Sequence, residues 1–244
     1  MIGTFLRTSG ALALLLLFGF LGVSGWRALD RPIAVVRVDG ELTAAERARA
    51  QELLSSHLPA GVLSVDTRRL RDLLERESWV DTVALWRTWP DGLRVEVRAE
   101  AALARWRDGA LLSARGRVIE PLELVGADAL PHLSGPEGSA VEVMQTFQRI
   151  ADVLRPHELR MDALDVDDDG NIRVHLRNGP ELILGHRDLG GRLQRVDLVL
   201  HQKFSDGLAE VERVDARYDN GVAVAWREGA SQQGGESRQL ARGF

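Results

Sequence analysis

Residues 79–97 read WVDTVALWRTWPDGLRVEV. Apolar and polar side chains alternate on both sides of the central turn residues, as expected of two strands that each bury one face. The turn itself, Trp-Pro-Asp-Gly at 89–92, combines residues that favour a tight reversal of the chain. The stretch therefore predicts a β-hairpin, with one strand from Trp79 to Trp86 and a returning strand through Val97.

A strand and two helices are predicted directly before this hairpin. Apolar residues alternate over residues 33–38, which indicates a strand. Thr43 and Glu46 have the spacing of a capping box, so a helix is expected to begin there. Asp66 is placed to cap a second helix. The order strand, helix, helix, strand, strand predicts a small α+β domain over residues 33–100.

A second, β-rich domain is predicted over residues 101–228. Short alternating segments separated by turn residues indicate an antiparallel sheet. Apolar residues at helical spacing predict two amphipathic helices, over residues 141–154 and 189–204. The Pro/Gly-rich stretch 131–138 is interpreted as a loop. Residues 229–244 are rich in Gly, Ser, Gln and charge, which predicts a disordered tail.

The segment before these domains is predicted to be a transmembrane helix over residues 9–26. Residues 8–26 carry no charge, and at 1.5 Å per residue they extend about 28 Å, close to the roughly 30 Å of a hydrocarbon core. Residues 1–8 then form a short cytoplasmic tail and residues 27–32 a linker. The long polar region that follows favours a cytoplasmic N-terminus and C-terminal domains outside the cytoplasm. A cleaved signal peptide is the alternative, because the most apolar part of the segment is short.

Composition narrows the classes of function for this chain of 244 residues. A net charge of −5 argues against a nucleic-acid-binding protein, which usually has a basic face. The absence of cysteine excludes thiol catalysis, disulfides and cysteine-ligated metals. Neither a GxSxG elbow nor a phosphate-binding loop occurs. We therefore expect no catalytic residue, no cofactor and no small-molecule substrate. A periplasmic hydrolase with an unrecognised carboxylate site is the enzymatic alternative.

Two patterns in the sequence are similar to those of metal sites. Residues 165–170, DVDDDG, match the first half of a calcium loop, but Leu176 stands where the twelfth position requires Glu. The flanking segments alternate as strands do, which favours a solvated hairpin turn. The six histidines show neither HxxxH nor HExxH spacing and are interpreted as scattered surface or half-buried residues. No metal site is predicted.

The candidate binding surface is the final hairpin, from Tyr218 to Trp226. A terminal strand often lies at the edge of a sheet, where unpaired N–H and C=O groups can accept another strand. Ordinary packing at a sheet edge is the alternative. The other tryptophans that lie on or beside predicted strands are expected to serve in core and edge packing; these are Trp79, Trp86, Trp89 and Trp106.

The order and spacing of these segments resemble the FtsQ/DivIB family of bacterial cell division proteins. The strand–helix–helix–strand–strand module predicted over residues 33–100 resembles a POTRA domain. The resemblance covers nearly the whole chain after the linker. It is carried by residues 33–40, 79–97, 104–106, 133–138, 178–179 and 214–221, and by Trp226.

The resemblance implies a non-enzymatic scaffold of septum assembly, held in the inner membrane by one helix, with periplasmic domains and enriched at the division septum. It implies binding to FtsB and FtsL, recruitment of later division proteins, and contacts of the POTRA domain with other division proteins. The last strands of the family receive an FtsB segment by strand addition. This role carries onto the partner-binding residues Tyr218, Asn220, Gly221, Val222, Val224 and Trp226.

Two points qualify the resemblance. The N-terminal tail of about seven residues is shorter than in many relatives, so either the true start lies upstream or the cytoplasmic contacts are minimal. The alternative function is that of another POTRA-containing envelope assembly or secretion factor, although such proteins usually carry several POTRA repeats.

Overall fold

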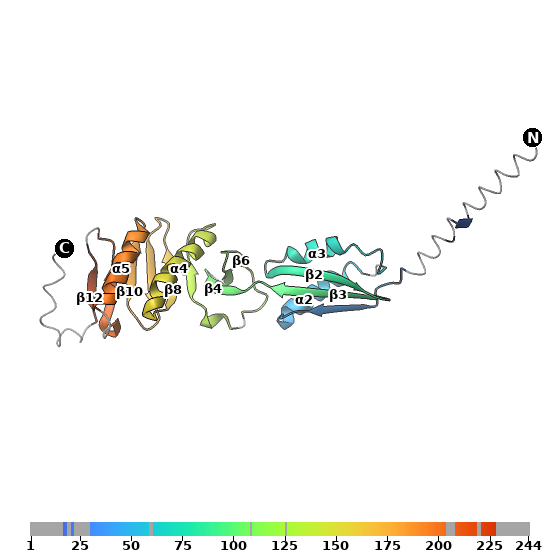
Figure 1. Ribbon diagram of the computed structural model, residues 1–244, viewed down its shortest axis with the longest axis horizontal. Coiled ribbons are helices and arrows are strands. Elements are labelled where there is room, and N and C mark those ends of the chain that lie inside the picture. Colours follow the sequence, from blue (N-terminus) through green and yellow to red (C-terminus); the bar gives the residue numbers. More distant parts are fainter. Residues whose placement is uncertain are drawn as a thin grey trace, which may run out of the picture. The chain divides into compact units, whose positions relative to one another are not determined.

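The computed structural model describes residues 17–18, 21, 30–58, 61–107, 109–124, 126–203, 208–218 and 221–227 (Figure 1). The chain forms two compact units, Met1–Glu100 and Ala101–Phe244. Within the described ranges, no helix combines the length and the apolar character that crossing a membrane requires. The predicted transmembrane segment 9–26 lies outside them, except for three exposed helical residues, Leu17, Phe18 and Leu21. The predicted tails 1–8 and 229–244 also lie outside them.

The first unit contains a three-stranded sheet with the spatial order β1–β3–β2. The predicted hairpin is present as the antiparallel pair β2 and β3, and β1 pairs with β3 in parallel. A parallel pairing needs a long crossover connection, which the two helices between β1 and β2 help to provide. The elements are β1 (Val35–Asp39), α2 (Ala44–Ser55), α3 (Thr67–Glu75), β2 (Val80–Thr88) and β3 (Gly92–Ala99).

Both helices of the first unit begin at the predicted caps. Thr43 Oγ1 accepts a hydrogen bond from the Glu46 amide at 3.2 Å, and Glu46 Oε2 accepts one from the Thr43 amide at 2.8 Å. Asp66 Oδ1 accepts from the amides of Arg68 and Arg69 at 3.0 and 3.1 Å. Each cap contributes about 0.5–2 kcal/mol to helix stability. Local chemistry therefore determines where α2 and α3 start.

The core of the first unit contains side chains of the helices and of the sheet. Leu74 of α3 and Val95 of β3 are fully buried. Trp79 is 2% exposed, which confirms the packing expected of it. Trp86 and Trp89 are 48% and 59% exposed, so neither packs in the core.

The second unit is built on a nine-stranded sheet with the order β12–β11–β10–β9–β8–β7–β4–β5–β6. Its strands are β4 (Ala102–Trp106), β5 (Ala110–Ser113), β6 (Val118–Ile119), β7 (His132–Ser134), β8 (Met161–Val166), β9 (Ile172–Leu176), β10 (Glu181–Gly185), β11 (Val211–Asp215) and β12 (Ala223–Trp226). Its α-helices are α4 (Ala140–Leu154) and α5 (Leu189–Lys203). Short 3₁₀ turns cover Ala127–Ala129, Arg155–His157 and Leu208–Glu210.

The prediction of an antiparallel sheet is wrong for three neighbouring pairs. The pairs β4–β7, β7–β8 and β10–β11 are parallel. The stretch 131–138, interpreted as a loop, contains β7, which lies between β4 and β8 with Leu133 fully buried. A strand of three residues is too short to show a period in the sequence. Helices α4 and α5 then serve as the crossovers from β7 to β8 and from β10 to β11.

Helices α4 and α5 lie on the same side of this sheet (Figure 1). Both contribute to one hydrophobic core with the strands, which include the 5% exposed Trp106 of β4. Val141, predicted for the apolar face of α4, is 47% exposed, so that prediction is wrong. The apolar stripe of α4 instead runs through Ala140, Val143 and Met144.

The turn between β8 and β9 is the hairpin turn that the sequence favoured over a calcium loop. Asp167 Oδ1 accepts hydrogen bonds from the amides of Asp169 and Asn171, at 3.0 and 2.8 Å. The side-chain hydrogen bond from Asn171, followed by these amides, lowers the pKa of Asp167. Asp167, the third residue of the stretch that resembles a calcium loop, thus uses its carboxylate to hold the turn.

Candidate partner-binding edge

Strand β12 ends the nine-stranded sheet. It pairs antiparallel with β11, through Val211–Trp226, Arg213–Ala225, Val214–Val224 and Asp215–Ala223, and within the described part of the chain it has no second neighbour. One side of β12 therefore presents backbone N–H and C=O groups that the sheet does not pair.

The two faces of β12 differ in their surroundings. Val222 and Val224 are partly buried and pack against the hydrophobic core, whereas Ala223 is exposed on the opposite face. Trp226 follows Val224 by two residues and pairs with the fully buried Val211, so the indole belongs to the core-side face. It is nevertheless 43% exposed. Trp226 thus presents a partly exposed apolar surface on the last strand of the described sheet.

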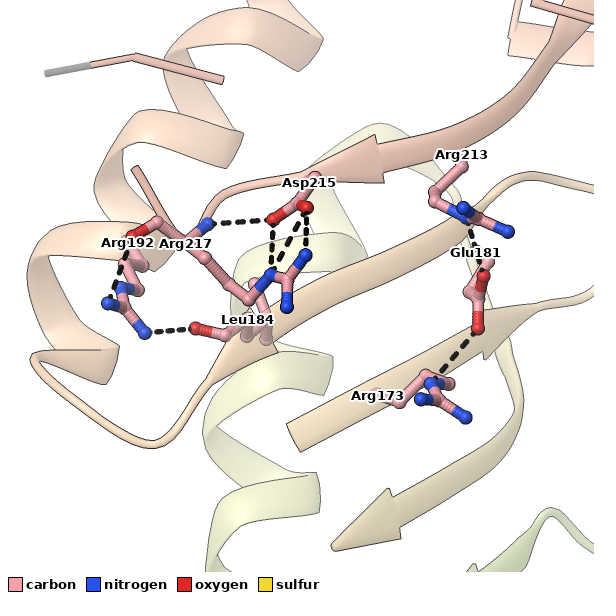
Figure 2. A network of polar contacts seen from close by, with 7 residues as sticks. All are labelled: Arg173, Glu181, Leu184, Arg192, Arg213, Asp215 and Arg217. Atoms are coloured by element: carbon pink, nitrogen blue, oxygen red, sulfur yellow. Dashed lines mark hydrogen bonds and ion pairs between the residues drawn. The ribbon is translucent and has the colours of Figure 1, made fainter. Parts of the chain in front are cut away.

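Charged side chains form a ladder across the three neighbouring strands on the face opposite the helices. Glu181 of β10 forms an ion pair with Arg173 of β9 at 3.2 Å and accepts a hydrogen bond from Arg213 of β11 at 3.0 Å (Figure 2). Both arginine side chains are about half exposed, so each ion pair contributes little stability, about 0–1 kcal/mol. The ladder helps to set the register of the strands that support β12.

The end of β11 is held by Asp215 and Arg217. The Arg217 guanidinium turns back onto the Asp215 carboxylate, with Nη2–Oδ2 at 2.7 Å and Nε–Oδ1 at 2.9 Å, and the Arg217 amide also donates to Oδ1 at 3.0 Å (Figure 2). The hydrogen bond from the Arg217 side chain is the main cause of a lowered pKa of Asp215. The backbone that leads into Tyr218 is thereby ordered.

Arg192 fastens the same segment from the helix layer. It lies on α5 and is 7% exposed, so its charge is buried. Its guanidinium donates one hydrogen bond to the carbonyl of Leu184, at the end of β10, and another to the carbonyl of Arg217 at 3.2 Å (Figure 2). A buried charge needs such partners. Arg192 therefore joins α5, β10 and the start of the β11–β12 connection.

Arg227 fastens the other end of β12. Its amide donates to the Glu210 carbonyl at 2.8 Å, and its guanidinium reaches the carbonyls of Val211 and Gly179 at 3.3 Å each. The arrangement thus holds both ends of the final hairpin through arginine contacts to backbone carbonyls, and none of the described strands pairs with the outer side of β12. This is a pre-formed edge for an added strand.

The predicted site residues fall along this edge. Tyr218 is 59% exposed and Trp226 is 43% exposed. Gly221, Val222 and Val224 are partly buried, and Asn220 lies outside the described residues. Sequence reasoning missed the arginines at 192, 217 and 227. An apolar helix face interrupted by Arg192, beside Leu193, was the one available signal for a buried charge.

The structure also corrects the interpretation of the histidines. His157 follows α4 and His201 lies on α5, and the two rings meet with centroids 4.5 Å apart. Asp197 of α5 lies beside both of them. His157 is half-buried and His201 exposed, as interpreted, but the two are not scattered, because the fold brings their rings together.

Two family models match the chain. The POTRA domain of FtsQ type matches residues 31–98, and the C-terminal domain of cell division protein FtsQ/DivIB matches residues 104–217. The second match ends just before Tyr218, so the β11–β12 turn and β12 lie beyond it. Both models are FtsQ models, which disfavours a secretion or outer-membrane assembly factor.

Similar proteins bear the description "Cell division protein FtsQ". The relative from Cellvibrio japonicus is 35% identical over 84% of this chain and 64% of its own length, so this chain spans just under two thirds of that relative. The relative from Hahella chejuensis is 33% identical over 87% of this chain and 76% of its own length. The relative from Thioalkalivibrio is 33% identical over 89% of this chain and 92% of its own length. On these matches, supported by the two domain models, the chain belongs to the FtsQ family of cell division proteins.

Proposed function

We propose that the chain acts in cell division as a non-enzymatic scaffold that binds a partner protein by adding one of the partner's strands to β12. The observation that carries this proposal is the position of β12 at the end of the described sheet, in a hairpin with Arg192 contacts at its start and Arg227 contacts at its end. Because the described edge is already ordered, binding a partner strand costs little conformational entropy in this chain.

The proposed partner is an FtsB segment, with FtsL in the same assembly. Membership of the FtsQ family supports this choice. The edge suits an extended segment whose backbone pairs with β12 and whose apolar side chains contact the exposed Tyr218 and Trp226. The assembled complex would then recruit later division proteins. The first unit, which matches the FtsQ-type POTRA domain, is proposed to contact other division proteins, with no residue assigned to that contact.

The proposed location is the inner membrane at the division septum. The uncharged segment 8–26 supports a single-pass anchor with a cytoplasmic N-terminus and both domains in the periplasm. N-terminal sequencing of the protein recovered from membranes tests this. An intact N-terminus is expected, and a mature chain beginning near Trp26 would establish a cleaved signal instead.

Binding tests the edge directly. In a fragment of residues 28–244, Tyr218→Glu and Trp226→Glu should each weaken FtsB binding by at least about 30-fold, since a buried aromatic anchor at an interface contributes about 2 kcal/mol or more. Trp89→Glu is the matched control, because Trp89 is similarly exposed but belongs to the first unit. Circular dichroism must show that all three variants stay folded. An FtsB affinity unchanged by both edge substitutions would reject the site.

Depletion of the protein in its source bacterium tests the role itself. Filamentous cells without septa are expected. Normal septation during depletion would reject a role in division, whatever the binding experiment shows.

A further inference from the structure

The end of α4 and the outer face of α5 bring together three side chains that commonly bind metals. His157 closes the 3₁₀ turn that continues α4, and Asp197 and His201 lie one turn apart on α5. Each residue offers one ligand atom, and the three atoms lie within 4.8 Å of one another. Within the described residues this is the one such group.

The geometry is close to that of a bound ion. His157 Nε2 and Asp197 Oδ1 are 2.8 Å apart, and His201 Nδ1 lies 3.5 Å from the same oxygen. Ligand atoms at about 2.0–2.2 Å from a tetrahedral zinc ion are separated by about 3.3 Å. These two spacings bracket that value, and the two histidine nitrogens lie within 4.8 Å of each other, so small side-chain shifts would complete the set.

The surroundings suit a cation. Asp197 Oδ1 lies between the two histidines, 2.8 Å from His157 Nε2 and 3.5 Å from His201 Nδ1, so an acidic oxygen stands at the centre of the group. Side-chain exposure rises from 11% at His157 to 44% at Asp197 and 63% at His201, so the group runs from the core to solvent. An ion could therefore enter from the solvent side and keep a water as its fourth ligand.

We propose that His157, Asp197 and His201 form a binding site for one divalent transition-metal ion, with Zn²⁺ the best fit. Two imidazole nitrogens and one carboxylate oxygen are ligands of zinc and its neighbours, whereas Ca²⁺ and Mg²⁺ prefer oxygen alone. The bound ion would replace the proton between His157 and Asp197 and link the end of α4 to α5. Its role is structural: it stiffens the helix layer from which Arg192 reaches the partner-binding edge. The metal site does not depend on the proposed FtsB binding.

The test uses the full-length chain without a histidine tag, purified in detergent and stripped with a chelator. Zn²⁺ is titrated by calorimetry and Co²⁺ by visible absorption. One ion per chain is expected, with tetrahedral Co²⁺ bands. At a free Zn²⁺ concentration 100 times the Kd, the melting temperature of the protein should rise by about 5–10 °C.

Substitutions distinguish Zn²⁺ binding at this site from nonspecific Zn²⁺ binding to other histidines. His157→Ala, Asp197→Asn and His201→Ala should each weaken Zn²⁺ binding at least about tenfold and remove the thermal shift. His175→Ala is the matched control, because His175 Nε2 pairs with Asp165 Oδ2 at 3.4 Å and no third ligand joins them within the described residues. It should bind Zn²⁺ as the parent does.

Two results would overturn the proposal: no Zn²⁺ binding at micromolar concentrations, or binding that the three ligand substitutions leave unchanged. His201 is largely exposed, so His201→Ala keeps the test decisive even if the variant at the more buried His157 fails to fold. Circular dichroism of each metal-free variant provides the check on folding.

Discussion

Replacing Arg192 with Met should destabilise the second unit by breaking the connection between α5 and the final hairpin. Methionine is uncharged and matches the aliphatic stem of arginine, so it keeps the packing of the stem and removes the guanidinium with its two hydrogen bonds. One of these bonds reaches the Leu184 carbonyl in the interior, and the other reaches the Arg217 carbonyl at 3.2 Å. Both carbonyls would lose their charged donor.

The magnitude follows from the burial of this contact. A hydrogen bond from a charged donor contributes about 1.5–3 kcal/mol, and burying the charge of Arg192, which is 7% exposed, costs part of that gain. We therefore expect a net loss of about 2–4 kcal/mol. With a urea m-value of about 2 kcal/mol/M for a unit of this size, the midpoint of unfolding should fall by about 1–2 M.

Urea unfolding of the 28–244 fragment, followed by circular dichroism, measures this shift. Arg177→Met is the matched control: Arg177 also forms an ion pair, with Asp162 at 2.7 Å, but both side chains are nearly half exposed. That control should lower stability by no more than about 1 kcal/mol. If the midpoint of the Arg192 variant shifts no further than that of the control, the buried guanidinium does not stabilise the hairpin and the reasoning is refuted.

Three further predictions concern the same unit. Leu133→Ala, in the strand that sequence analysis missed, should lower the free energy of unfolding by about 2–5 kcal/mol, since Leu133 is fully buried; urea unfolding measures this. Gly185→Ala should lower the free energy of unfolding by about 1 kcal/mol or more, because Gly185 has φ of +65° and an added Cβ would lie 2.6 Å from the Arg192 guanidinium. Gly190→Ala is the control: an added Cβ there meets open space, so the same measurement should show a neutral or slightly stabilising effect. Because the pKa of Asp215 is lowered, its interaction with Arg217 stabilises the fold above the ordinary aspartate pKa, and this stability is lost as the pH falls toward the lowered pKa. Asp215→Asn should therefore lower the melting temperature at pH 7 and reduce the fall of the melting temperature in acid. A melting temperature with an unchanged pH profile would contradict this role of Asp215.

Local patterns predicted the first unit well. The capping residues Thr43 and Asp66 and the hairpin at 79–97 depend on contacts between residues close in sequence, so they can be identified without the fold. The same patterns did not separate the buried Trp79 from the exposed Trp86 and Trp89, because exposure depends on what packs against a strand.

In the second unit, local sequence patterns did not predict the strand pairing or the contacts between distant residues. β7 has only three residues, and its importance comes from pairing in parallel with both β4 and β8. The meeting of His157 with residues of α5 likewise joins positions 40 residues apart in the chain. Neither relationship leaves a periodic signal, because the partners are distant in sequence.

Short-range chemistry was enough to predict the order of elements in the first unit, the positions of helix caps and turns, and the candidate hairpin ending at Trp226. The position of β12 at the end of the described sheet, and the arginine contacts on either side of the final hairpin, follow from the assembled fold: Arg192 reaches the Arg217 carbonyl before the hairpin, and Arg227 follows it. The physical reason is that an edge is defined by which strands pair, and a buried arginine by which distant carbonyls it reaches. Both are properties of the assembled sheet and its helix layer.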